Sequence, residues 1–267
     1  MVRRYMDRYV TEELHDFQNR TTRFRYLFSR LRNNAYAIVE QVAEELRYSD
    51  FVPLAFELSF GDHGVLPAVE ITEPDSQLRL GGKVDRVDGW LKDGKLYLRV
   101  VDYKSGRKAF DLAAVRMGLD IQMLLYLFTL QKEGKAYFGR EVEPAGVLYF
   151  PARDDILAAE RNISPDKLAQ ETAKQLRRSG LLLSDPAVLQ AMEHESLREP
   201  HFLPVRVSRD GSLSGSLASA AQLGKLGAYV DRLLREIARE VRRGNIDADP
   251  YWRGSTLNAC QWCEYAA

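Results

Sequence analysis

The segment GKVDRVDGWLKDGKLYLRVVDYKSG, residues 82–106, specifies the centre of the fold. Two runs in which apolar and polar residues alternate flank the pair Asp93-Gly94. An Asp-Gly pair between such runs is a strong β-hairpin signal. With these two residues as the loop, Lys92 pairs with Lys95, and the same register brings Asp85 opposite Asp102. A β-bulge near Gly89 would shift the pairing by one residue.

Two carboxylates at paired positions raise a problem of charge. Their Cβ atoms would lie roughly 5 Å apart, and like charges in that arrangement are destabilising. A divalent cation would compensate, since carboxylate oxygens suit Mg²⁺ or Mn²⁺. Lys104 follows Asp102 by two residues and shares its face of the strand. Asp85, Asp102 and Lys104 therefore form a candidate site for phosphodiester hydrolysis; the alternative is a solvated strand end with a surface Asp–Lys pair.

The run DLAAVRMGLDIQMLLYLFTLQK, residues 111–132, has the apolar content and spacing of one helix. Gln122 and Tyr126 are four residues apart and lie on one face of that helix. One interpretation is that this face lines the candidate site and contacts metal-bound water or a nucleic-acid backbone. The other is a helix edge that meets solvent.

The remaining pattern predicts a mixed α/β protein. Helices are expected at 21–47, 164–179, 184–195 and 217–243, and strands at 51–61, 65–72, 77–91 and 146–152. We expect three parts: an N-terminal helical segment that packs on the core (1–50), the core (51–160) and a helical C-terminal part (161–267).

Composition excludes several classes of protein. The chain has 267 residues, with 38 basic and 38 acidic side chains, which argues against a broadly basic nucleic-acid coat but not against a local basic groove. It contains no apolar run of roughly 18 residues and begins with a polar, charged segment, so we expect no membrane span, no leader and a cytoplasmic location. It has no phosphate-binding G-x-x-x-x-G-K-S/T pattern, so we expect it to bind no ATP.

Two further patterns each allow two interpretations. Cys260 and Cys263 form C-x-x-C, which is half of a four-ligand metal site or simply two unremarkable thiols. Arg23, Arg25 and Arg30 lie in a stretch without acidic residues. They could contact phosphate groups, or they could form a solvated helix face.

Three ordered elements, GGKVDRVD, VVDYKSG and GLDIQMLLYL, resemble the PD-(D/E)XK nuclease superfamily in its RecB-like branch. From about residue 20 to the end, the chain is also similar to the C-terminal nuclease domains of the AddB family, whose members are components of bacterial AddAB helicase-nucleases. The resemblance implies a restriction-endonuclease-like fold: a mixed central β-sheet flanked by helices, with a helical C-terminal region.

The resemblance also implies roles for single residues. Asp85 and Asp102 would bind Mg²⁺ or Mn²⁺, and Lys104 would be the catalytic lysine. Gln122 and Tyr126 would be the helix pair of the branch. Glu57, in the strand FELSFG, would be either a buried structural carboxylate or a catalytic one.

A nuclease of this family would cut single-stranded DNA, on the strand ending 5′, during double-strand-break repair by recombination. It would act in the bacterial cytoplasm beside an AddA-type helicase partner that binds the ATP. Two alternatives stay open: a nuclease fold that binds DNA or a partner without cutting, and another kind of RecB-like nuclease.

The family further implies a [4Fe-4S] cluster on four cysteines. Cys260 and Cys263 match two of them, whereas the other two, and a Gly-x-x-x-His motif, have no counterpart in this sequence. We therefore expect the chain to be a fragment with an incomplete cluster site.

Overall fold

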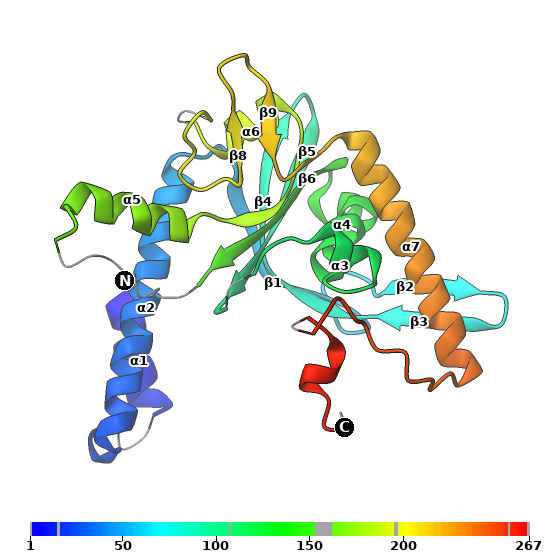
Figure 1. The fold of residues 1–267 in the computed structure, drawn as a ribbon, viewed down its shortest axis with the longest axis horizontal. Helices are drawn as coiled ribbons and strands as arrows, with labels where there is room; N and C mark the ends of the chain where they lie inside the picture. Colours follow the sequence, from blue (N-terminus) through cyan, green and yellow to red (C-terminus); the bar gives the residue numbers. More distant parts are fainter. Residues whose placement is uncertain are drawn as a thin grey trace.

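A computed structural model describes residues 2–14, 17–106, 108–152, 162–194, 197–255 and 257–265. Across these residues the main sheet has six strands in the order β1-β4-β5-β6-β7-β10, with helices on both of its faces (Figure 1). The predicted mixed sheet flanked by helices is confirmed. The strands are β1 (Val52–Phe60), β4 (Gly82–Lys92), β5 (Lys95–Lys104), β6 (Val142–Pro151), β7 (Ser179–Leu183) and β10 (Leu217–Ala218).

The β4–β5 hairpin has the register that the Asp93-Gly94 turn predicts. The two strands pair from Lys92↔Lys95 to Arg86↔Val101 without a shift. Asp93 and Gly94 both have positive φ angles, as the tight turn requires. No bulge at Gly89 shifts this pairing. The pairing of β1 with β4 does contain a register shift, between Pro53 and Ala55.

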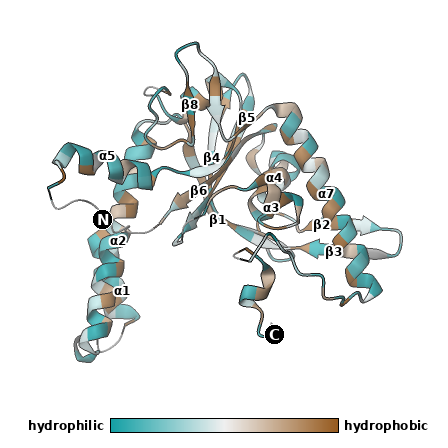
Figure 2. Cartoon of the chain, in the orientation of Figure 1, coloured by the Kyte–Doolittle hydropathy of each residue, from teal (hydrophilic) through white to brown (hydrophobic). Residues whose placement is uncertain are grey.

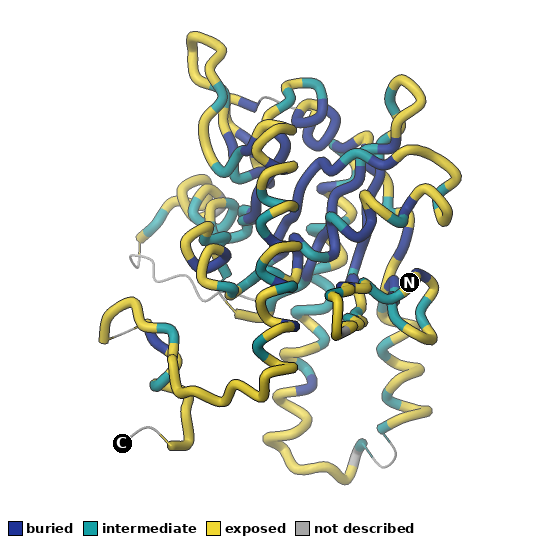
Figure 3. Tube along the Cα trace, turned by 90° about the vertical axis from the view of Figure 1, so that its right-hand side faces the viewer, coloured by how far each residue is buried: buried dark blue, intermediate teal, exposed yellow. Residues whose placement is uncertain are grey.

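Helix α2 (Thr22–Arg47) covers one face of the sheet. Thr21 is its N-cap, and the side chain of Thr21 accepts a hydrogen bond from Phe24 N. Helix α1 (Val2–Glu12) packs on α2, and a short 3₁₀ turn, η1 (Phe17–Asn19), lies between them. Figure 3 shows that α1 and the first half of α2 are largely exposed, whereas α2 reaches the buried sheet near its C-terminal end. α2 thus joins an exposed arm to the core.

The single helix expected at 111–132 is wrong, because the structure has two. Helix α3 (Leu112–Arg116) ends before Gly118, and α4 (Gln122–Phe138) begins after Asp120. Gly118 and Asp120 have φ angles of 81° and 57°, which lie outside the helical region. The break places Gln122 in the first turn of α4.

The C-terminal part holds helices α5 (Pro165–Leu176), α6 (Pro186–Met192) and α7 (Ala220–Arg243), the hairpin of β8 (Val205–Val207) and β9 (Leu213–Gly215), and the turn η2 (Ala259–Trp262). Strands β7 and β10, which lie after residue 160 and join the central sheet, were not expected from the sequence. The proposed boundary at residues 160 and 161 lies outside the described residues, and the three-part division stays a prediction.

Strands at the centre of the sheet supply most of the core. Figure 2 shows hydrophobic residues concentrated there and on the facing sides of α4 and α7, and Leu98, Val100, Leu124 and Val147 are fully buried. Each such side chain contributes about 1.5–3 kcal/mol to folding. The strand expected at 65–72 corresponds to β2 (Val69–Glu73). The single strand expected at 77–91 is wrong, because the structure has two strands there, β3 (Ser76–Leu80) and β4, in different sheets. β2 and β3 form a hairpin that packs on α7. None of the helices in the described ranges is long and apolar enough to cross a membrane.

Candidate active site

Asp102 and Lys104 lie at the C-terminal end of β5 and interact directly. Lys104 Nζ is 2.7 Å from Asp102 Oδ2, and the Asp102 side chain is only 10% exposed whereas that of Lys104 is 35% exposed. Strand alternation places both on one face, with Tyr103 between them on the other. The buried carboxylate therefore lies at the base of the site and the ammonium group at its mouth.

Asp85 is held beside this pair by the backbone. Its Oδ2 accepts a hydrogen bond of 2.9 Å from Tyr103 N. This side-chain bond joins β4 to β5 just beyond the last pair of the regular backbone ladder. Arg86↔Val101 is the last regular pair, and Asp85 and Asp102 are the next residues on the two strands. The structure thus brings together the three residues that the hairpin register predicted.

The electrostatics of Asp102 favour a bound cation. Burial raises the pKa of Asp102 and the charge of Asp85 adds to the rise, while Lys104 and the more distant Lys108 lower it. The balance is a raised pKa, so the charged carboxylate has too little positive charge around it. A divalent cation between Asp85 and Asp102 would supply that charge.

The donor set fits Mg²⁺ better than a metal that needs a full protein cage. Among the described residues, no group of three or more His, Cys, Asp or Glu side chains could hold a metal ion. Mg²⁺ is usually held by one or two carboxylates, with water and phosphate oxygens as its other ligands. Asp85 and Asp102 provide that number of carboxylates.

Three more polar residues surround the site, and none of them was singled out from the sequence. Lys108 forms an ion pair with Asp120, the residue in the break between α3 and α4. Tyr149 pairs with Asp102 across β5 and β6, and burial, with the charges of Asp120 and Asp102, raises its pKa to about 12. The register of β6 against β5 could have identified Tyr149, but Lys108 and Asp120 follow loops whose course the sequence does not specify.

Gln122 and Tyr126 form a bonded pair on α4. Gln122 Nε2 donates a hydrogen bond of 2.6 Å to the hydroxyl of Tyr126, a residue that is 5% exposed. Tyr126 packs edge-on against Phe60, and a Cβ atom at Gly82 would lie 3.0 Å from its hydroxyl oxygen. The pair therefore lies against Gly82 at the start of β4, and Gly82 precedes Asp85 by three residues. Gln122 and Tyr126 share one face of the helix, as their spacing predicted.

The opposite face of the same hairpin carries a buried network of five charged residues. Glu45 of α2 bonds Arg86, Arg99 and Arg178 at distances of 2.8–3.3 Å. Asp88 lies 2.9 Å from both Arg86 Nε and Arg99 Nε. Three arginines bind the Glu45 carboxylate, and despite its burial its pKa is lowered to about 2. This network fastens α2 and the segment before β7 to the hairpin.

Comparison with known proteins identifies the family of the chain. The model of the PD-(D/E)XK nuclease superfamily matches residues 2–267. The chain belongs to the PD-(D/E)XK nuclease superfamily. It is similar to a subunit of the ATP-dependent helicase/deoxyribonuclease of Acetivibrio thermocellus, with 36% identity over 247 residues, which are 91% of this chain and 21% of that protein. The protein of the same name from Clostridium kluyveri is 33% identical over 268 residues, 98% of this chain and 23% of that protein. The chain therefore spans less than a quarter of the length of these relatives.

Two other sets of predicted site residues have no printed hydrogen bond or ion pair to Asp85, Asp102 or Lys104 in the described part of the chain. Glu57 is nevertheless close to the candidate site, because its neighbours on β1, Phe56 and Leu58, pair with Arg86 and Val84, the residues on either side of Asp85. Glu57 has a φ angle of 51° and a side chain that is 64% exposed, 3.1 Å from Lys83. Its interpretation as a buried structural carboxylate is therefore wrong. Arg23, Arg25 and Arg30 are exposed on the half of α2 that leads away from the sheet. Since α2 covers the face of the network, these arginines do not meet Asp85 or Asp102.

The two cysteines do not make a complete cluster site. Cys260 and Cys263 lie in and just after η2, with a hydrogen bond of 3.3 Å from Cys263 N to Cys260 O. Both thiols are free, and no third ligand group stands with them in the described part of the chain. A [4Fe-4S] cluster needs four thiolates, so the residues of this chain do not fit one.

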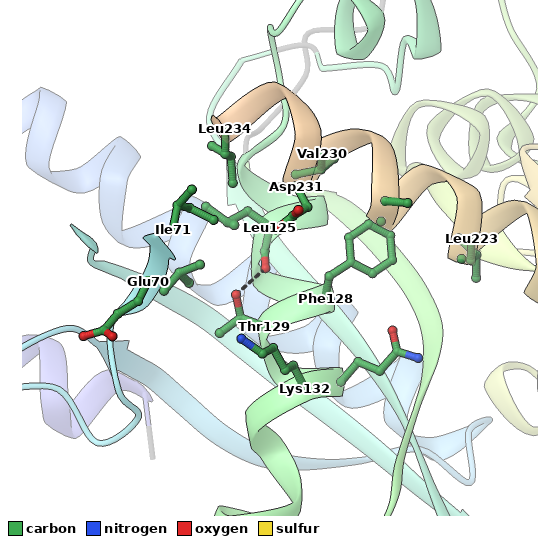
Figure 4. A pocket seen from close by; sticks show the side chains of 15 residues that line it. Glu70, Ile71, Leu125, Phe128, Thr129, Lys132, Leu223, Val230, Asp231 and Leu234 are labelled. Carbon is green, nitrogen blue, oxygen red and sulfur yellow. Dashed lines mark hydrogen bonds between the residues drawn. The ribbon is translucent and has the colours of Figure 1, made fainter. Parts of the chain in front are cut away.

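Two pockets differ in how close they lie to the candidate site. One, of about 300 Å³, lies between α4, β2 and α7 and is lined mainly by Ile71, Leu125, Phe128 and Leu234 (Figure 4). Thr129 in its wall bonds Leu125 O, and none of the candidate catalytic residues lines it. Another, of about 260 Å³, is lined by Lys104 and Tyr149 and adjoins the carboxylates. Of these two pockets, only the second has polar side chains, those of Lys104 and Tyr149, next to Asp102.

Proposed function

We propose that the chain is a metal-dependent deoxyribonuclease domain that hydrolyses phosphodiester bonds of single-stranded DNA, with Mg²⁺ or Mn²⁺ as its cofactor. One observation carries the proposal. Asp85 and Asp102 converge at the end of the β4–β5 hairpin, with Lys104 2.7 Å from Asp102 and with the pKa of Asp102 raised. Membership in a nuclease superfamily supports the same reaction.

The residues of the chain divide the work as follows. Asp85 and Asp102 hold the cation, which when bound polarises a phosphoryl oxygen and makes a bound water more acidic. Lys104 orients the attacking water or stabilises the negative charge that develops on the phosphate. Gln122 and Tyr126 contact the strand or bound water next to β4. Water is added across one P–O bond, so that one product ends in a hydroxyl group and the other in a phosphate.

The relatives suggest a wider setting. Their names describe them as subunits of an ATP-dependent helicase/deoxyribonuclease. We propose that this chain is the nuclease part of such an assembly, that an AddA-type partner supplies ATP-driven unwinding, and that the domain cuts the strand ending 5′ during double-strand-break repair. Arg23, Arg25 and Arg30 would guide DNA or contact the partner at a distance from the cut. Cys260 and Cys263 would take part in a cluster only with thiolates from outside this chain.

Cleavage of end-labelled single-stranded DNA tests the proposal. The chain is incubated with Mg²⁺ or Mn²⁺, with EDTA, and as the variant Asp85→Asn/Asp102→Asn. Asp75→Asn, an exposed residue at the β2–β3 turn, is the matched control. We expect cutting that requires metal, persists in the control and is lost in the double variant. A folded chain that cuts under none of these conditions would instead favour the non-cleaving binding module.

A further inference from the structure

The pocket beside the carboxylates has an unusual balance of charge. Lys104, Lys108 and Arg177 line it, and it has no acidic residue in its wall. Lys108 is anchored there because its carbonyl oxygen accepts a 2.7 Å hydrogen bond from the hydroxyl of Ser179. The pocket therefore presents positive charge directly next to Asp102.

A second pocket, of about 500 Å³, shares a lining residue with the first. Arg177 lines both, and the second is also lined by Lys174 and Arg198 near α5 and by Arg206 on β8, with Glu199 as its acidic residue. Together the two pockets have six lysines and arginines and one acidic residue. The whole chain has equal numbers of basic and acidic side chains, and the pocket in Figure 4 has two acidic residues and one lysine. Three of the six cations pair with carboxylates that lie outside the pocket walls: Lys104 with Asp102, Lys108 with Asp120 and Lys174 with Glu171. The case for a phosphate contact therefore depends most on Arg177 and Arg206.

Arg177 stands where the two pockets meet. It follows the last turn of α5, and its Nη2 donates a 2.8 Å hydrogen bond to Pro200 O. Its Nε is buried and has no hydrogen-bond partner among the described residues. Gln175 Oε1, in the wall of the inner pocket, is buried without a partner as well. A buried cationic donor that lacks an acceptor is costly, and a phosphate oxygen would satisfy it.

Arg206 marks the outer end of the path. It is exposed on the short strand β8 and pairs with no acidic residue in the described ranges. Since a free guanidinium is well suited to a phosphate, Arg206 and Arg177 provide two contact points beyond Lys104 and Lys108.

We propose that these two pockets form one trough that holds the phosphate backbone of a nucleic-acid strand, from the scissile bond at Asp102 past Arg177 to Arg206. The trough rests on the proposed function for the identity of its substrate. A row of cations leading away from the catalytic carboxylates matches a polyanionic strand, whereas a single small anion would need only one of the two pockets.

Strand binding without cleavage tests the trough. A fluorescein-labelled 20-nucleotide thymidine oligonucleotide is titrated in EDTA, by fluorescence anisotropy, at several salt concentrations. The chain is compared with Arg177→Gln, Arg206→Gln and Arg140→Gln. Arg140 is the matched control, because it is exposed at the far end of β6 from the site. Circular dichroism establishes that each variant is folded.

Each lost phosphate contact should lower the slope of log affinity against log salt by about 0.7. We expect that loss for Arg177→Gln and for Arg206→Gln, a weaker affinity at low salt in both, and no change for Arg140→Gln. Equal slopes in folded Arg206→Gln and the unaltered chain would overturn the trough, because the Arg206 guanidinium forms no ion pair with another described residue that could mask its loss.

Metal-free binding separates this result from the failure of the nuclease proposal. A chain that cuts DNA while both variants keep the full salt slope is a nuclease without this trough. A chain that never cuts, yet loses slope in both variants and not in the control, has the trough and lacks the proposed reaction.

Discussion

Asp102 and Glu45 are both buried carboxylates at the β4–β5 hairpin, one on each face, and they behave in opposite ways. Burial raises the pKa of Asp102, and Lys104 does not fully offset it. Burial also opposes the charge of Glu45, but Arg99, Arg178 and Arg86 outweigh it and lower its pKa to about 2. The difference is the number of cations that each carboxylate meets.

This contrast separates a structural site from the candidate catalytic site. The carboxylate of Glu45 has its charge fully compensated by protein groups, so it needs nothing from outside and fastens α2 to the sheet. Asp102 shares its site with Asp85 and meets one nearby ammonium group. The face that is short of positive charge is the face that can bind a cation.

The largest expected effect is on catalysis at Asp102. Asp102→Asn should lower metal-dependent cleavage by at least about 10³-fold, because the Lewis acid that it holds contributes several kcal/mol to the barrier. The free energy of unfolding should stay within about 1 kcal/mol, since a charge disfavoured by burial is removed. Single-turnover cleavage and urea unfolding measure the two quantities. A variant that cuts normally would show that Asp102 binds no catalytic metal.

A substitution in the buried network should have the opposite pattern: a large loss of stability and a small change in cleavage. Glu45→Gln leaves Asp88 as the carboxylate partner of Arg86 and Arg99 and removes the carboxylate partner of Arg178, so we expect a loss of about 3–5 kcal/mol in the free energy of unfolding. Cleavage by the folded fraction should change less than about threefold. Glu44→Gln, the exposed neighbour on α2, is the control and should shift stability by less than about 0.5 kcal/mol. A stable Glu45→Gln variant would contradict the role assigned to the network.

As the pH falls, Mn²⁺ binding at Asp102 should be lost first, and the stability that Glu45 contributes should be lost second. The raised pKa of Asp102 means that protons compete for it first, so Mn²⁺ affinity should fall by about tenfold per pH unit once the pH drops below that value. Glu45 has its pKa lowered from 4.5 to about 2, so its stabilising contribution is complete above 4.5 and is lost between those values. Electron paramagnetic resonance of Mn²⁺ and circular dichroism follow the two events. If the chain unfolded at a higher pH than the one at which it lost Mn²⁺, the order of the two pKa values, Asp102 above Glu45, would be contradicted.

The sequence predicted the geometry of the candidate catalytic face better than that of the buried network. A two-residue Asp-Gly turn between alternating strands determines the register, and the register alone places Asp85 next to Asp102. Tyr126 beside Gln122 follows from the periodicity of a helix. These contacts are local or depend on one short turn, so sequence spacing is enough to find them.

The buried network depends on contacts that sequence spacing does not encode. Glu45 meets Arg178 across 133 residues, through the packing of α2 and of the segment before β7 against the sheet. β7 was missed for a related reason, because its short run Gly-Leu-Leu-Leu has no alternation and gains its identity by pairing with β6. Arginines in a strand are ordinarily expected on an exposed face, whereas Arg86 and Arg99 are fully buried in the folded chain.

The smallest expected effect concerns Tyr103, which contacts both faces. Its backbone N–H donates to Asp85, and its hydroxyl accepts a 2.9 Å hydrogen bond from Arg86 Nη1. Tyr103→Phe keeps the first bond and removes the second, so we expect a loss of about 1 kcal/mol in stability and a change below about threefold in Mn²⁺ affinity. Tyr97→Phe, on the same strand, is the control. If Tyr103→Phe instead weakened Mn²⁺ binding about tenfold while Tyr97→Phe did not, the network would be setting the position of Asp85, and the two faces would act as one unit.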